Sequence, residues 1–469
     1  MLGPVRSVTV ALIAGALVAC SGPRPAAENG EPRPDLPLAA GPEAQRLDGE
    51  VRDYLAPLVE AGRLSGNVLV GTRDSILVLQ SYGLADAGTA TPNDADTRFI
   101  IASITKTFTS AAILTLVADG RVDLDDPLAR FAPDFPRADE ITIRQLLLHE
   151  SGVGDPDPLD WFESPESPIS LEELVDRIAE RPFLFDPGTD EAYSNAGYAL
   201  LARVIERASG QPYGEYLRTA LFDPLGMSGS GLFLVPGPAP GRATGYLPAP
   251  PPENRVVTMD VDLGLATGSG ALSSTAPDLW RWARAVADER LYSWKTLEWP
   301  YGWGREEIGE HEGIEQTGAL PGFMSNLLVF PDADRFVVLL LNQEYGGWID
   351  LGLGVAALAL GEDPGPIDLP RGIELDVAGA GRFVGRYTDG EQPIRLALED
   401  GDLWLHWGDW PISKYLQPIG PATFAVPSDR GRIRFEDPAA DGRFQTMVWD
   451  FGEGAMTFER TEQSQTGSG

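Results

Sequence analysis

Apolar residues form short runs in some stretches and follow helical spacing in others, and this difference predicts where strands and helices lie. Short apolar runs, consistent with buried strands, occur at both ends of the first 360 residues, and helical spacing fills the stretch between them. The expected strands are 67–70, 76–79, 326–330 and 336–341, and the expected helices are 51–61, 103–119, 141–149, 171–180, 196–209 and one that carries Trp280 and Trp282. Strands from both ends around a helical middle predict an α+β fold, with one antiparallel sheet formed by both ends of the domain and a helical subdomain against it.

A region of alternating apolar and polar residues begins near residue 376, after a proline-rich stretch at 364–370. Its short alternating strands are separated by Asp-Gly turns, which favour hairpins. The expected strands include 394–398, 403–407 and 432–435. We therefore predict a linker over 363–375 and a small antiparallel meander or barrel over 376–465.

The N-terminus has the pattern of a targeting segment. Arg6 is the only charged residue before Cys20, and the apolar stretch 8–19 is too short to span a bilayer comfortably. Leu17-Val18-Ala19-Cys20 looks like a bacterial lipobox, which implies a signal peptide over 1–19, cleavage before Cys20 and acylation of that cysteine. An ordinary secretory signal with a chance cysteine is the alternative.

Further expectations follow from the lipobox. Ser21 after Cys20 suggests, by analogy, the periplasmic face of an outer membrane, with a proline-rich tether over 20–45. Cys20 is the only cysteine, so an internal disulfide is excluded.

The net charge of the chain argues against two classes of binding partner. The formal net charge of −34 repels nucleic acid, so no nucleic-acid partner is expected, and anionic lipid heads are set aside as well. The acidity predicts a solvated surface, with adaptation to high salt as an alternative. No His-Glu-x-x-His motif or cysteine pair occurs, so we expect no metal site and no cofactor. The three histidines, His149, His311 and His406, are interpreted as a turn residue, a hairpin residue and a strand residue.

The tetrad Ser103-Ile104-Thr105-Lys106 carries the strongest chemical signal. Lysine occurs at only three positions, against 33 arginines. This bias suggests that Lys106 has a chemical role that arginine could not fill. A buried lysine can lose its proton and act as a base, whereas arginine stays charged. Positions i and i+3 of a helix share one face, so Ser103 and Lys106 are expected to point together into one cleft, as a serine nucleophile and its base.

Two more motifs follow the tetrad. Tyr193-Ser194-Asn195 stands before the helix 196–209, and Gln316-Thr317-Gly318 stands just before a strand. With these motifs in this order, the chain resembles the serine beta-lactamase and penicillin-binding protein superfamily, in its class C-related hydrolase branch. The resemblance covers roughly residues 46–360, and we place the catalytic domain at 46–362. The surrounding sequence resembles the family in four stretches, 99–106, 147–152, 186–188 and 270–276.

The resemblance implies a role for each motif. Ser103 would form an acyl-enzyme, with Lys106 as base, Tyr193 as base and acid, and Asn195 orienting both Lys106 and the substrate. The backbone N–H groups of Ser103 and Ala319 would form the oxyanion hole. Gln316, Thr317 and Gly318 would bind substrate. The C-terminal region resembles the lipocalin-like domains of some relatives, which could cover the active-site mouth, contact a partner or only stabilise the protein.

One position departs from the family pattern. The family usually carries Lys or His where Gln316 stands, and that side chain helps to hold a substrate carboxylate. A neutral amide binds a carboxylate more weakly than a cation does, so we expect weak use of penicillins and D-alanyl peptides. Two other interpretations stay open, namely that another cation, such as an arginine, reaches the site, or that activity has been lost.

The function expected is a serine hydrolase that acts through an acyl-enzyme on an ester, amide or peptide bond of a small molecule or peptide. The alternatives are a true beta-lactamase or D-alanyl-D-alanine carboxypeptidase, and a non-catalytic protein that binds cell-wall peptides. Oligomeric state is not predicted.

Overall fold

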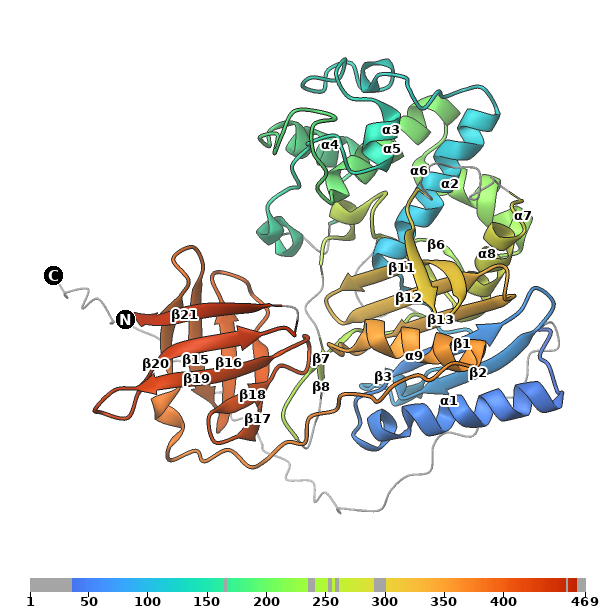
Figure 1. The fold of residues 1–469 in the computed structure, drawn as a ribbon. Helices are drawn as coiled ribbons and strands as arrows, with labels where there is room; N and C mark the ends of the chain where they lie inside the picture. Colours follow the sequence, from blue (N-terminus) through green and yellow to red (C-terminus); the bar gives the residue numbers. More distant parts are fainter. Residues whose placement is uncertain are drawn as a thin grey trace, which may run out of the picture.

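The structure, a computed structural model, describes residues 36–163, 167–234, 241–251, 255–257, 261–290, 301–452 and 454–461. Cys20, the predicted signal peptide and most of the predicted tether lie outside these residues. The described chain forms a mixed α/β part and an all-β barrel, which lie beside each other (Figure 1). The strand and helix elements do not by themselves fix domain limits, so the limits at 362 and 376 stay predictions.

The mixed part is built on a six-stranded antiparallel sheet in the order β10-β11-β12-β13-β1-β2. The pairing of β1 with β13 joins the two ends of this part, which confirms the predicted closure of the sheet. The strands are β1 (Gly66–Gly71), β2 (Ile76–Tyr82), β10 (Gly304–Ile308), β11 (His311–Leu320), β12 (Phe323–Phe330) and β13 (Arg335–Leu341).

Both faces of the sheet are buried. Along β13, Val337 and Leu339 join one core while Val338 and Leu340 join the other, because successive side chains point to opposite faces. One face is covered by α1 (Pro42–Glu60) and α9 (Trp348–Leu360), and the other by α8 (Ala276–Ala287) and the helical part (Figure 1). Helix α9 was not predicted, because apolar residues on almost every side of it hide the helical period.

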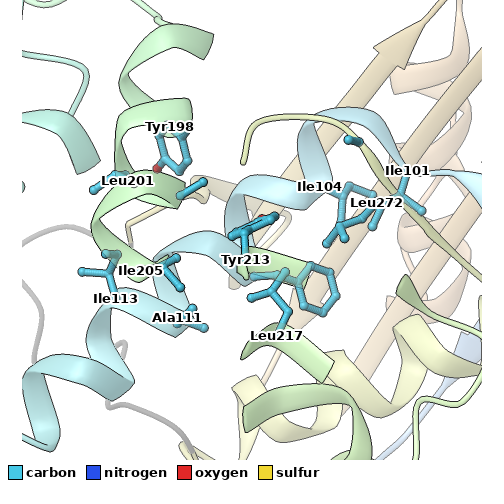
Figure 2. Packing of buried hydrophobic residues seen from close by; sticks show 14 of the residues in the cluster. Ile101, Ile104, Ala111, Ile113, Tyr198, Leu201, Ile205, Tyr213, Leu217 and Leu272 are labelled. Atoms are coloured by element: carbon cyan, nitrogen blue, oxygen red, sulfur yellow. The ribbon is translucent and has the colours of Figure 1, made fainter. Parts of the chain in front are cut away.

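The helical part packs around α2 (Thr105–Ala118), which is buried on nearly every side. Ala111 and Ile113 of α2 lie among Leu201 and Ile205 of α5 (Figure 2). A helix that is apolar all round is stable only inside a protein, so α2 is a fixed support for the residues before it. The other helices here are α3 (Ile143–Leu147), α4 (Leu171–Ala179), α5 (Asn195–Ser209), α6 (Tyr213–Leu217) and α7 (Asp223–Leu225).

The other strands of the mixed part are short and, in the described residues, form three small sheets. They are β3 (Leu84–Asp86), β4 (Thr91–Pro92), β5 (Phe99–Ile100), β6 (Gly231–Leu232), β7 (Tyr246–Pro248), β8 (Arg255–Val257) and β9 (Leu272–Ser274). The pairing of β5 with β9 places the chain that leads to Ser103 beside the stretch 270–276.

The C-terminal part is a closed eight-stranded barrel in which each strand pairs with the next and β21 returns to β14. This confirms the predicted antiparallel barrel. Its interior is filled by aromatic side chains such as Phe383, Phe424 and Phe435. The strands are β14 (Gly385–Thr388), β15 (Pro393–Glu399), β16 (Asp402–Trp407), β17 (Lys414–Gly420), β18 (Thr423–Ala425), β19 (Arg432–Pro438), β20 (Phe444–Asp450) and β21 (Ala455–Thr461).

The barrel contacts the mixed part at several places, including the following two. Arg63 donates a hydrogen bond to Gln417 Oε1 at 3.1 Å, beside an interdomain cavity of about 500 Å³. The ring of Trp410 meets the ring of Phe162 edge to face, with their centroids 4.9 Å apart. Within the described ranges, no helix has the length and apolar character to cross a bilayer.

Candidate active site

Ser103 lies on a single 3₁₀ turn, Ala102–Ile104, that leads directly into α2. The predicted helix 103–119 therefore begins two residues later, at Thr105, because its first turn is tightened. Ala102 has a φ of +45°, which is unusual for a residue with a side chain. Ser325 Oγ donates to the carbonyl of Ile101 at 2.8 Å, so β12 holds this turn in place. Such local strain, maintained by its surroundings, is typical of functional sites.

Lys106 is fully buried one turn of helix behind Ser103. Its Nζ lies 3.4 Å from Ser103 Oγ, 2.8 Å from Asn195 Oδ1 and 3.0 Å from the carbonyl of Ser269. Burial lowers the pKa of Lys106 to about 7, and the negative charge of Asp155 opposes this shift in part. A substantial fraction of Lys106 is therefore neutral at neutral pH.

The partners of Lys106 fix the direction of its lone pair. Asn195 Oδ1 and the Ser269 carbonyl are acceptors only, so they take two N–H groups of a neutral amine. The lone pair that remains can face the third neighbour, Ser103 Oγ. This arrangement suits an amine that receives the proton of the serine hydroxyl.

Tyr193 contacts both Ser103 and Lys106. Its hydroxyl donates to Ser103 Oγ at 2.8 Å, and the centre of its ring lies 4.6 Å from Lys106 Nζ. The residue as a whole is 56% exposed, but the hydroxyl end points inward, and burial of that end raises the pKa of the phenol to about 12. Tyr193 therefore keeps its proton at neutral pH.

Asp155 holds the first residues of α5, Asn195 and Ala196, and no sequence motif singled it out. Its carboxylate accepts hydrogen bonds from Asn195 Nδ2 at 3.1 Å and from the backbone N–H groups of Asn195 and Ala196 at 3.3 and 2.8 Å. A carboxylate at a helix N-terminus is favoured by the helix dipole. Because Asp155 takes the amide N–H, the oxygen of Asn195 is left facing Lys106.

His149 is a turn residue, as predicted, but it also lies beside the site. Its φ is +63°, and its Nδ1 accepts from the backbone N–H of Ser194 at 3.1 Å. Its ring packs on the ring of Tyr193, with their centroids 4.7 Å apart. Burial lowers the pKa of His149 to about 4, so its ring is a neutral support for Tyr193. The sequence signal that could have placed His149 at the site is its position in the stretch 147–152, which resembles the family.

Strand β11 forms the other wall of the site. Its pairing with β10 reaches only as far as Glu315, which lies opposite Gly304, the first residue of β10. Residues 316–320 therefore extend past β10 and face the turn that carries Ser103. Gln316 Nε2 donates to the carbonyl of Ser103 at 3.1 Å. A Cβ on Gly318 would lie 2.9 Å from the backbone nitrogen of Ser103, so only glycine allows this approach. Thr317 and the exposed Ala319 follow on the same edge.

The structure thus brings Ser103, Lys106, Tyr193, Asn195 and Gln316 into one hydrogen-bonded group, with Thr317, Gly318 and Ala319 along its wall. Cys20, predicted as a lipidation site, lies outside the described residues. In the part of the chain that the structure describes, no group of three or more His, Cys, Asp or Glu residues is placed to hold a metal ion.

Comparison with known proteins gives consistent similarities. The model of the family described as Beta-lactamase matches residues 51–360. Esterase EstB of Burkholderia gladioli is 32% identical over 372 residues, covering 69% of this chain and 92% of that protein. The crystal structure of a penicillin binding protein from Bacillus halodurans is 28% identical with a TM-score of 0.58, covering 65% of this chain and 99% of that one. The structure of D-amino acid amidase from Ochrobactrum anthropi SV3, complexed with D-phenylalanine, is 26% identical with a TM-score of 0.58, covering 64% and 92%.

Proposed function

This chain belongs to the beta-lactamase family and is a serine hydrolase, and we propose that Ser103 is its nucleophile and that neutral esters or amides are its preferred substrates. The observation that supports this most directly is the chain of contacts from Tyr193 Oη through Ser103 Oγ to Lys106 Nζ. Neutral Lys106 is a base beside a hydroxyl that is otherwise a poor nucleophile.

Acylation uses these contacts in order. Ser103 Oγ attacks the substrate carbonyl carbon while its proton passes to Lys106 Nζ. The carbonyl π electrons move to oxygen and give a tetrahedral oxyanion. The backbone N–H groups of Ser103 and Ala319 would hold this oxyanion, with each donor contributing on the order of 3 kcal/mol. The close approach of Gly318 to Ser103 keeps these two donors on the same side of the cleft.

The leaving group then needs a proton. Tyr193 holds one at neutral pH and can donate it to the departing oxygen or nitrogen, while the ammonium of Lys106 returns a proton to the phenol. Collapse of the oxyanion breaks the bond to the leaving group and leaves the acyl group on Ser103. Water then attacks the ester carbon and gives its proton to Lys106, which is neutral again. The second tetrahedral intermediate collapses, the bond from the acyl carbon to Ser103 Oγ breaks, and Lys106 returns the proton to Oγ. Asn195, held by Asp155, keeps the amine aligned throughout.

The preference for neutral substrates rests on Gln316. This side chain carries no charge, and its Nε2 is engaged by the carbonyl of Ser103. A charge-assisted hydrogen bond to a carboxylate contributes about 1.5–3 kcal/mol, against about 1 kcal/mol for a neutral one. An esterase and an amidase among the relatives are compatible with a substrate bond of this kind.

Labelling tests the nucleophile. The full chain should react with a fluorophosphonate probe at Ser103, as located by mass spectrometry, and Ser103→Ala should lose both the label and turnover without a change in thermal unfolding. Surviving turnover in Ser103→Ala would refute the assignment. A lasting adduct with a fluorescent penicillin, or rapid turnover of it, would favour a carboxypeptidase or a beta-lactamase. Labelling by neither probe would favour a binding protein.

A substitution tests the role of Gln316. Gln316→His places a side chain that can carry a positive charge at this position. It should improve hydrolysis of a carboxylate-bearing ester about tenfold relative to its neutral analogue, which corresponds to roughly 1.4 kcal/mol. Gln316→Asn is the matched control without charge. If Gln316→His leaves the ratio of the two rates unchanged, the account of Gln316 fails.

Membrane attachment is proposed on the lipobox alone. We propose that Cys20 is acylated and anchors the protein in the bacterial cell envelope, on the periplasmic face of the outer membrane. Radioactive palmitate should label the mature protein, and Cys20→Ala should abolish the label. An unlabelled wild-type protein would refute the anchor.

A further inference from the structure

A cavity of about 240 Å³ lies between the catalytic sheet and the barrel, at the end of β11. It begins at Ala319, whose N–H is one proposed oxyanion donor, and continues past the end of that strand. Its walls come from both parts of the protein, with Ala319, Leu320 and Met324 on one side and Trp410, Ile412 and Lys414 on the other.

The barrel segment 408–414 reaches both sides of the active-site cleft. Trp410 lines the cavity that starts at Ala319, on the sheet side. The same ring packs edge to face on Phe162, in the 3₁₀ turn Pro158–Phe162 of the helical side. That turn begins three residues after Asp155, which accepts from Asn195. Trp410 thus contacts both the cavity that starts at Ala319 and a turn of the helical side.

The charged groups at the far end of the cavity have a small negative excess. Lys414 Nζ lies 3.3 Å from Asp429 Oδ2, so this cation already has a carboxylate partner. Glu344 also lines the cavity, and its Oε1 accepts from the backbone N–H of Gly322 at 3.1 Å. Lys414, Asp429 and ionised Glu344 together carry a formal charge of −1, which opposes binding of a carboxylate. Gln316, in the other direction along β11, carries no charge.

We propose that the barrel segment 408–414 is the outer wall of the substrate pocket, and that this pocket selects substrates with a large apolar group and no carboxylate. This deepens the proposed function and rests on it. The group would lie on the side of the reacting carbonyl away from Gln316, against Trp410, Ile412 and Met324. Apolar contact is the dominant source of affinity in such pockets, and the polar groups set orientation.

Ester series on the full chain test this wall. One series varies the acyl chain, from p-nitrophenyl acetate to p-nitrophenyl octanoate, and a second varies the alcohol, from ethyl acetate to octyl acetate. In the series whose variable group enters the cavity, Trp410→Ala should lower kcat/KM for the long member roughly tenfold and leave the short member within about twofold. Trp410→Phe, which keeps an aromatic ring against Phe162, should retain most of the wild-type preference.

Two further measurements complete the test. A p-nitrophenyl ester of the same length as the octanoate but ending in a carboxylate should be hydrolysed at least about tenfold less well by the wild type. Leu398→Ala, on a barrel residue that does not line the cavity, should leave all ratios unchanged.

The inference is overturned if Trp410→Ala changes long and short members equally, if it changes neither series, or if the carboxylate ester is preferred. Fluorophosphonate labelling at Ser103 separates the two hypotheses. If the wild type is labelled and hydrolyses the acetate esters, but Trp410→Ala behaves like the wild type, only the proposed role of segment 408–414 is refuted. If the wild type is neither labelled nor active, the proposed function itself is refuted.

Discussion

At the scale of single residues, the site depends on one buried amine. Lys106 is surrounded by acceptors and by the rings of Tyr193 and Tyr198, and within the described residues no carboxylate accepts a hydrogen bond from its Nζ. The nearest negative influence, Asp155, is directed at Asn195. Burial therefore dominates, and the amine loses its proton far below the ordinary lysine range. A carboxylate in direct contact with Nζ would have kept it charged and unable to act as a base.

The pH dependence of kcat/KM should report this amine. The folded pKa of Lys106 is lowered from 10.5 to about 7, so the reactive neutral form grows as pH rises through 7 and activity levels off above about pH 8. His149 near 4 and Tyr193 near 12 titrate outside this window. Lys106→Arg, which stays protonated, should lose at least about 10³-fold in kcat at every pH. A profile that is flat between pH 5 and 9 would place the base elsewhere.

At the scale of elements, the sequence predicted the helices and strands that have a local pattern of apolar residues. It did not predict a residue whose role depends on contacts with distant parts of the chain. The continuous apolar run 336–341 and the helical spacing of 196–209 were sufficient for β13 and α5. Spacing and family resemblance led to Ser103 and Lys106, because both belong to one turn of helix. Asp155 could not be found in this way, since its role exists only where the loop before α4 meets the start of α5, forty residues away.

The contact between β11 and the turn of Ser103 gives a prediction at this scale. In Gly318→Ala, the added Cβ would lie 2.4 Å from the carbonyl of Ile101 and 2.9 Å from Ser103 N, both of them backbone atoms that cannot rotate away. We expect kcat to fall by at least about 10², the loss typical of one misplaced oxyanion donor, with about 1–3 kcal/mol lost in unfolding free energy from overpacking. Steady-state kinetics and denaturant unfolding measure the two effects.

Gly49→Ala is the matched control for that substitution. Gly49 lies inside α1 with no atom within 4 Å of an added Cβ, so alanine should raise the unfolding free energy by up to about 1 kcal/mol and leave kcat unchanged. Wild-type kcat in Gly318→Ala would show that β11 does not position the nucleophile.

At the scale of the whole molecule, one buried cation ties the barrel to the catalytic part. Arg63 is 8% exposed, follows α1, and donates to Gln417 Oε1 of β17. Burial lowers the pKa of Arg63, and the tyrosines Tyr415 and Tyr345 lie near it. A buried guanidinium needs hydrogen-bond acceptors. Arg63 gains its acceptor on Gln417 when the barrel docks, so the two are coupled. Since Trp410 is on the same barrel, the docking also sets the outer wall proposed for the substrate pocket.

A double-mutant cycle tests that coupling. Gln417→Leu removes the acceptor while the charge stays buried, so the unfolding free energy should fall by about 1.5–3 kcal/mol and the preference for long esters should weaken. Arg63→Met with Gln417→Leu removes both polar partners, and apolar replacement of a pair is often nearly neutral, so the double variant should regain most of the stability lost by Gln417→Leu. Gln392→Leu, at an exposed turn of the barrel, controls for the change of residue type. If the double variant is less stable than Gln417→Leu alone, the guanidinium has other acceptors, and the barrel is held by its remaining contacts with the catalytic part.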